Sequence, residues 1–158
     1  MLDLYRVTMM HMPMTLSAQL ADAGFAKANT ARLMQFLERV SIREGETLLK
    51  QGDEADRLYF IERGTVSVYL EIDTGERVRL QTLGLGTAAG ELGMYLGAKC
   101  TASVIADSPG MVYRLTRAAL TKMQEEEPEL AAAFHQFVAR LLSERLAATT
   151  RTLEAVLR

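Results

Sequence analysis

The sequence predicts a mainly β domain flanked by helices (α+β), with a sandwich or barrel of short strands at its centre. Turn signals recur at intervals of roughly ten residues through the middle of the chain, with short alternating runs between them. Apolar residues recur at helical spacing on both sides of this region. The 158 residues are enough for one domain with a sizeable core.

The composition is ordinary for a globular protein, with 49% hydrophobic residues, 24% charged residues and a formal net charge of −2. This balance argues against a nucleic-acid partner, because phosphate neutralisation needs clustered Lys and Arg. No run approaches the roughly 18 to 20 apolar residues of a membrane helix, so we expect no direct membrane insertion. A single cysteine, Cys100, excludes an internal disulfide and fits a cytoplasmic setting.

Residues 1–14 hold five of the nine methionines without a clean period, and we interpret them as a flexible lead-in. Within them, "MMHMPM" (Met9–Met14) could bind a soft metal through thioethers and His11, but a disordered terminus is the stronger interpretation. Two histidines and one cysteine in the whole chain leave no zinc site, so we predict no metal site.

Two short helices are predicted between Leu16 and about Val40, separated by the stretch "AGFAKANT". Asn29 or Thr30 is the expected N-cap of the second helix. The apolar residues at helical spacing are Leu16, Leu20, Ala31, Met34, Phe36 and Leu37.

Short strands follow, and the clearest runs from Thr65 to Ile72. Its alternation should send Val66, Val68, Leu70 and Ile72 to one face and Ser67, Tyr69 and Glu71 to the other. A second strand is Arg77–Leu83, with Val78 and Leu80 opposite Arg77, Arg79 and Gln81. The run "RLYFIE" predicts a more buried strand, and "ASVIA" and "MVYRLT" predict two more.

Two helices are predicted after Leu115. The first has Thr116 as its N-cap, and the second, a long helix, has Pro128 in its first turn and continues to Arg158. The first half of the long helix has a broad apolar face suited to packing on the barrel: Leu130, Phe134, Phe137, Val138 and Leu141. The second half narrows to a seam that predicts a homodimer: Leu142, Leu146, Thr149, Leu153 and Val156.

This order of elements resembles the cyclic nucleotide-binding domain family. The phrases that carry the resemblance are "REGETLLKQGDEADRLYFIERGTVSVYL", "LGLGTAAGELGMYLG" and "TASVIA". The resemblance implies a double-stranded jelly-roll β-barrel with N-terminal helices and a short plus a long C-terminal helix. Residues 15–158 would form the domain, with the barrel at about 40–116 and the C-terminal helices at about 117–158. The ending, from "PELAAAF" onward, is similar to the C-terminal domain of some bacterial SulP-type sulfate transporters.

The resemblance also implies a phosphate-binding cassette, a short helix between two strands. The family pattern is Gly-Glu-Leu followed by Pro-Arg-Ser/Thr-Ala, in which the Glu receives the ribose 2′-hydroxyl and the Arg pairs with the cyclic phosphate. Gly90, Glu91 and Leu92 match the first part, and Thr101 and Ala102 match the end of the second. Lys99 stands at the Pro position and Cys100 at the Arg position.

The missing arginine predicts that binding of cyclic AMP or cyclic GMP is weak or lost, with Lys99 as a partial substitute that cannot copy a bidentate fork. Thr101 stands beside the phosphate position, where the resemblance implies a preference for cyclic GMP in part of the family. Glu91 could instead be a solvated carboxylate at a helix start. Cys100 could be a small buried hydrophobe or a redox thiol whose pKa is lowered by Lys99 and the helix N-terminus.

These features predict a regulatory, ligand-sensing domain that controls an attached or associated anion transporter. The alternative is a degenerate barrel that has lost its ligand and acts only in protein interaction or dimerisation. A transcription factor is disfavoured, because family regulators that bind DNA carry a helix-turn-helix segment after the long helix. No Ser, His and acid set forms a recognisable hydrolase motif, and we expect neither enzyme activity nor a cofactor.

Overall fold

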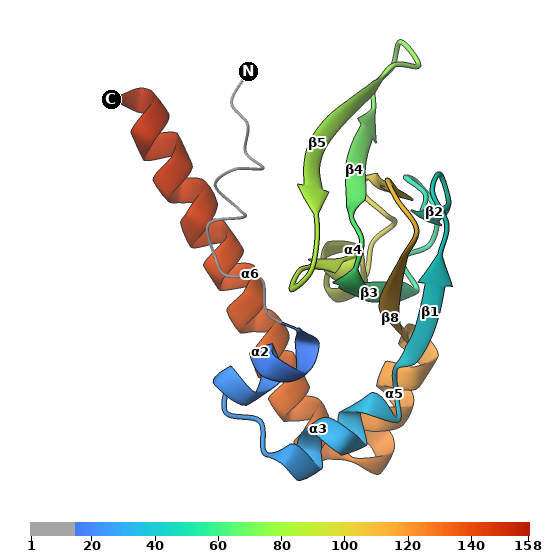
Figure 1. The fold of residues 1–158 in the computed structure, drawn as a ribbon, viewed down its shortest axis with the longest axis vertical. Coiled ribbons are helices and arrows are strands. Elements are labelled where there is room, and N and C mark those ends of the chain that lie inside the picture. The colour runs from blue at the N-terminus through green and yellow to red at the C-terminus, as the bar shows by residue number, and fades with distance from the viewer. Residues whose placement is uncertain (1–14) are drawn as a thin grey trace.

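The structure is a computed structural model that describes residues 15–158. Residues 1–14, predicted as a flexible lead-in with the methionine-rich stretch Met9–Met14, lie outside the described residues. The described part contains two helices, six strands, a short helix, two strands and two final helices (Figure 1). In chain order the elements are α2 (Leu16–Asp22), α3 (Lys27–Met34), β1 (Glu38–Ile42), β2 (Thr47–Leu49), β3 (Arg57–Arg63), β4 (Val66–Glu71), β5 (Arg77–Leu83), β6 (Ala88–Ala89), α4 (Glu91–Leu96), β7 (Ser103–Ala106), β8 (Gly110–Thr116), α5 (Arg117–Glu126) and α6 (Pro128–Leu157).

The eight strands form two four-stranded antiparallel sheets, in the orders β1-β8-β3-β6 and β2-β7-β4-β5. One cluster of buried residues belongs to the barrel strands and includes Ile61, Val66 and Val112. A second cluster joins the helices to the outside of the first sheet through Leu58, Phe60 and Leu115. The predicted fold class, a jelly-roll barrel with flanking helices, is confirmed.

The predicted strands at β3, β5, β7 and β8 are confirmed within one or two residues. The alternation predicted for β4 is broken by a register shift between Val68 and Tyr69. Val66 is fully buried, and Ser67 is equally buried. The Ser67 hydroxyl is satisfied in this position because it donates to Asp107, the residue after β7, at 2.7 Å. Ile72 lies beyond the strand and is 40% exposed.

The N-terminal predictions need two corrections. The second helix, α3, begins at Lys27 with Ala26 as its N-cap, so neither Asn29 nor Thr30 caps it. The helical region ends at Met34 rather than near Val40, because the chain turns there and Glu38–Ile42 pair with β8. Phe36 and Leu37 keep the helical spacing of apolar residues without being helical, since both pack against the helix cluster from the connecting turn.

The predicted starts of the two C-terminal helices and the buried first half of the long helix are confirmed. The Thr116 hydroxyl caps α5 by accepting from the Ala119 amide at 3.1 Å, and Pro128 opens α6. The first half of α6 is buried against the barrel side as expected, with Phe134 packed edge-to-face on Phe60 at 6.2 Å between ring centroids. Leu141 is partly buried in the same cluster.

The second half of α6 extends away from the sheets, and its C-terminal end stands well apart from the strands (Figure 1). The exposed fractions of Leu146, Leu153 and Val156 are 67%, 55% and 45%. Leu142, at the start of the predicted seam, still packs against the helix cluster. The exposure expected of these seam residues in an unpaired chain is therefore confirmed.

Candidate ligand-binding site

The site begins at the turn between β6 and α4. Ala88 and Ala89 pair with Phe60 and Tyr59 of β3, and Gly90 then turns the chain with a φ of +91°. A Cβ atom on Gly90 would lie 2.7 Å from the Arg57 carbonyl oxygen, so both the backbone conformation and the space require glycine. This turn places Glu91 at the first position of α4, facing inward.

An open cavity of about 70 Å³ lies between the start of α4, the β7 end and α6. Six of the seven predicted site residues line it: Gly90, Glu91, Leu92, Cys100, Thr101 and Ala102. Lys99 does not line the cavity; its side chain is exposed and its backbone bridges to Glu54. The expectation that Lys99 partly replaces the missing arginine is therefore not supported by its position.

Glu91 is 4% exposed, which contradicts its alternative interpretation as a solvated helix-start carboxylate. Its Oε1 atom forms an ion pair with Nη1 of Arg145 on α6, and Arg145 also donates from Nη2 to the Ala88 carbonyl oxygen at 2.9 Å. Its Oε2 atom is buried and has no hydrogen-bond partner within residues 15–158. The carboxylate therefore has one oxygen held by the protein and one oxygen left without a donor.

Arg145 is the residue of this site that sequence reasoning missed. Arg145 lies three residues after Leu142, which itself lies four residues after Val138. It therefore continues the stripe of α6 that packs on the domain. A charged side chain at a position of the packed stripe is the signal that could have identified it. Its side chain is 25% exposed and lines the cavity opposite the cassette.

Cys100 is 8% exposed and belongs to the buried cluster of the barrel. Burial raises the pKa of its thiol, and the negative charges of Asp53 and Asp56 raise that pKa further. The thiol is therefore protonated at neutral pH, and the expectation of a pKa lowered by Lys99 and the helix N-terminus is wrong. The interpretation of Cys100 as a small buried hydrophobe is the one that its surroundings favour.

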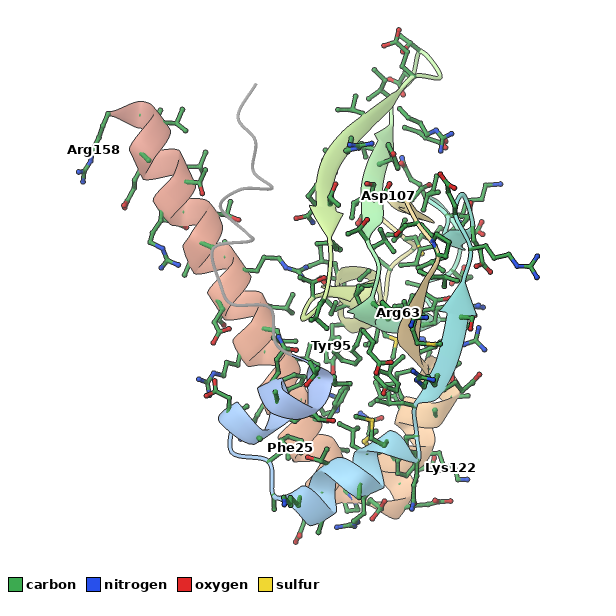
Figure 2. All side chains as sticks on the ribbon, in the orientation of Figure 1. Phe25, Arg63, Tyr95, Asp107, Lys122 and Arg158 are labelled. Atoms are coloured by element: carbon green, nitrogen blue, oxygen red, sulfur yellow. The ribbon has the colours of Figure 1, made fainter. Side chains whose placement is uncertain are left out.

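A second link connects α4 to the C-terminal helices. The Tyr95 hydroxyl lies 2.9 Å from Nδ1 of His135 on α6, and the other ring nitrogen of His135 lies 2.9 Å from Nε2 of Gln124 on α5. Burial raises the pKa of Tyr95 to about 12, so its hydroxyl stays protonated over the physiological range. Figure 2 shows Tyr95 on the side of the barrel that faces α6.

The part of the chain that the structure describes contains no group of three or more His, Cys, Asp and Glu residues placed to hold a metal ion. Within the same residues, no helix combines the length and the apolar character needed to cross a membrane. The cavity at α4 is where the sequence motif and the geometry coincide, because six of the seven predicted site residues line it.

Comparison with known proteins shows to which family the chain belongs. A family model described as "Cyclic nucleotide-binding domain" matches residues 39–127, which include every strand from β2 to β8, all of α4 and all of α5. The chain belongs to the cyclic nucleotide-binding domain family. This domain superposes on a cyclic nucleotide-binding domain from Methylobacillus flagellatus with a TM-score of 0.75 and 26% identity, over 83% of this chain and 74% of that one.

This cyclic nucleotide-binding domain is also similar to two further proteins, one in sequence and one in fold. The cAMP-dependent protein kinase type II regulatory subunit of Drosophila melanogaster is 47% identical over 66 residues, which cover 42% of this chain and 17% of that protein. The Thermus thermophilus catabolite activator protein shares the fold, with a TM-score of 0.68 and 24% identity over 84% of this chain and 61% of that one. The domain spans between 16% and 26% of the length of the curated relatives it matches.

Proposed function

We propose that this domain binds a cyclic nucleotide, cyclic AMP or cyclic GMP, in the cavity at the start of α4 and acts as a regulatory rather than a catalytic module. The observation that carries the proposal is the buried Oε2 atom of Glu91, which lacks a donor within the described residues. A buried carboxylate oxygen without a partner is costly, and a ligand hydroxyl removes that cost. The ribose 2′-hydroxyl is such a donor.

Binding of the cyclic phosphate is weak, because position 100 offers a neutral thiol instead of a guanidinium. Asp53 and Asp56 add negative charge near this position, and negative charge opposes a phosphate. Lys99 points its charge to solvent rather than into the cavity. The pocket therefore keeps its contact for the sugar and lacks the main contact for the anion.

The second half of α6 pairs with its copy in a homodimer, and the domain controls an attached or associated anion transporter of the SulP type. Support for the dimer comes from the exposed seam of Leu146, Leu153 and Val156. Support for the transporter comes from the similarity of the C-terminal sequence noted above. The alternative is a barrel that has lost its ligand and serves only in dimerisation or protein interaction.

Substitution of Glu91 tests the ligand proposal. Glu91→Ala should weaken cyclic nucleotide binding by about 1–3 kcal/mol, roughly 5- to 150-fold, through loss of the hydroxyl contact. The fold should survive, because Arg145 is one quarter exposed and can turn to water. The measurement is the dissociation constant by titration calorimetry, with circular dichroism as the check on folding.

The matched control is Glu144→Ala, which removes an exposed carboxylate of α6 that pairs with Arg140. This control should leave the dissociation constant unchanged, since Glu144 lies outside the cavity. An unchanged dissociation constant for Glu91→Ala as well would remove Glu91 from the site.

A further inference from the structure

We propose that Arg145 is the positioning residue of the pocket: it holds one oxygen of Glu91 so that the other is presented to a ligand hydroxyl, and it thereby couples the occupied pocket to α6. This inference rests on the proposed function. It assigns a role to a residue of the long helix that lies outside the matched family segment of residues 39–127.

The geometry of the carboxylate is the first argument. The two oxygens of Glu91 have different environments, since Oε1 is paired with Arg145 and Oε2 is buried without a donor. A guanidinium with several donors could engage both oxygens, yet here its second nitrogen donates to the Ala88 carbonyl oxygen at 2.9 Å. Arg145 is thus fixed by two acceptors on β6 and α4, and the remaining oxygen of Glu91 is left for an outside donor.

Electrostatics is the second argument. A carboxylate as buried as Glu91 is costly to keep ionised unless a cation compensates it. Among the residues that line the cavity, Arg145 is the one that carries a positive charge. Its guanidinium therefore compensates the buried carboxylate of Glu91 through the ion pair, and a carboxylate accepts a hydroxyl hydrogen bond more strongly than a neutral acid does.

The third argument concerns α6. Arg145 follows Leu142, which packs on the helix cluster, and precedes the exposed seam residues Leu146, Leu153 and Val156, although Thr152 farther along is buried. The ion pair to Glu91 and the Tyr95–His135 contact are two links from α4 to the same helix, about ten residues apart along α6. A ligand that bonds to Glu91 and shifts α4 therefore acts on α6 through Arg145, which immediately precedes the exposed seam.

The test compares two ligands in the wild type and two variants. Arg145→Ala should weaken cyclic AMP binding by about tenfold or more, whereas it should weaken binding of 2′-deoxy cyclic AMP by less than about threefold, because that ligand lacks the hydroxyl that Glu91 receives. Arg140→Ala is the matched control, since it removes an arginine of the same helix whose partner Glu144 is exposed. It should change neither affinity. If the wild type binds too weakly, all variants carry Cys100→Arg.

Three results overturn the positioning role. An equal loss for both ligands would mean that Arg145 contacts another part of the nucleotide, such as its phosphate. A gain in affinity for Arg145→Ala would mean that the ion pair competes with the ligand. Retention of wild-type affinity by Arg145→Ala would mean that Glu91 needs no positioning.

A ligand-free measurement separates this inference from the proposed function. If no cyclic nucleotide binds even to the Cys100→Arg protein, the proposed function fails, and hydrogen exchange of the unliganded protein decides the role of Arg145. Arg145→Ala should raise amide exchange in α4 by about tenfold, and Arg140→Ala should not. Equal exchange in the wild type and both variants would show that Arg145 does not hold α4.

Discussion

Replacing Cys100 with arginine is expected to strengthen binding of cyclic AMP and cyclic GMP by roughly tenfold to more than a thousandfold. A charge-assisted hydrogen bond contributes about 1.5–3 kcal/mol, and loss of one partner of a buried charged pair costs about 2–5 kcal/mol. About 1.4 kcal/mol corresponds to a factor of ten in affinity. The cavity wall already contains position 100, so a longer side chain there extends into space that the ligand shares. Arginine also offsets the negative charge of Asp53 and Asp56 that now surrounds the thiol.

Titration calorimetry on the wild type and three variants measures this gain. Cys100→Ser, which keeps the size and adds no charge, should bind as weakly as the wild type. Cys100→Lys should gain less than Cys100→Arg, because a point charge lacks the bidentate fork. Sub-micromolar binding by the wild type would contradict the account, since it would show that the pocket does not need a guanidinium at this position.

If α6 pairs with its copy as proposed, two glutamates in its seam are expected to convert the dimer to a monomer. Leu146 and Leu153 are 67% and 55% exposed, and burying such a side chain contributes about 1.5–3 kcal/mol at best. Val156 adds a third, and two-fold symmetry doubles the set, so the total can exceed the several kcal/mol that association costs. Leu146→Glu with Leu153→Glu replaces the two central contacts by like charges in both chains.

The control places the same two charges elsewhere on the helix. Ala147 and Ala155 are exposed and lie off the seam, so Ala147→Glu with Ala155→Glu should leave the dimer intact. Light scattering over a range of concentrations gives the mass of each protein. A wild type that is monomeric at high micromolar concentration would refute the dimer, and a dimer that persists in the seam variant would place the interface elsewhere.

The parts of the fold that could be predicted are those with strong local signals. Thr116 and Pro128 have capping and first-turn roles that depend on their own chemistry, and both helices begin where these residues indicate. The strand Arg77–Leu83 was bounded correctly by its flanking turns. The strand Glu38–Ile42 was missed because its order comes from pairing with β8, more than 60 residues away, rather than from its own pattern.

The candidate site likewise contains residues that a local motif predicts and residues that only tertiary packing brings in. The motif around Gly90 and Glu91 is local, and the residues it predicted share one cavity apart from Lys99. Lys99 was included for its charge, but the direction of its side chain depends on the turn after α4, which the sequence does not specify. Arg145 comes from 54 positions farther along the chain than Glu91, and only tertiary packing brings the two together.

Titration of ¹⁵N-labelled protein with cyclic AMP, followed by amide chemical shifts, tests most directly whether this pocket binds a cyclic nucleotide weakly. The account predicts shifts in fast exchange that concentrate at Gly90–Leu92 and Cys100–Ala102 and extend to Arg145. Amides near Phe25, which lies between α2 and α3 and outside the cavity, should stay unchanged. Cyclic GMP should shift the same amides, and adenosine 5′-monophosphate serves as the non-cyclic control. An absence of shifts at millimolar ligand, or shifts confined to residues outside the cavity, would contradict the account.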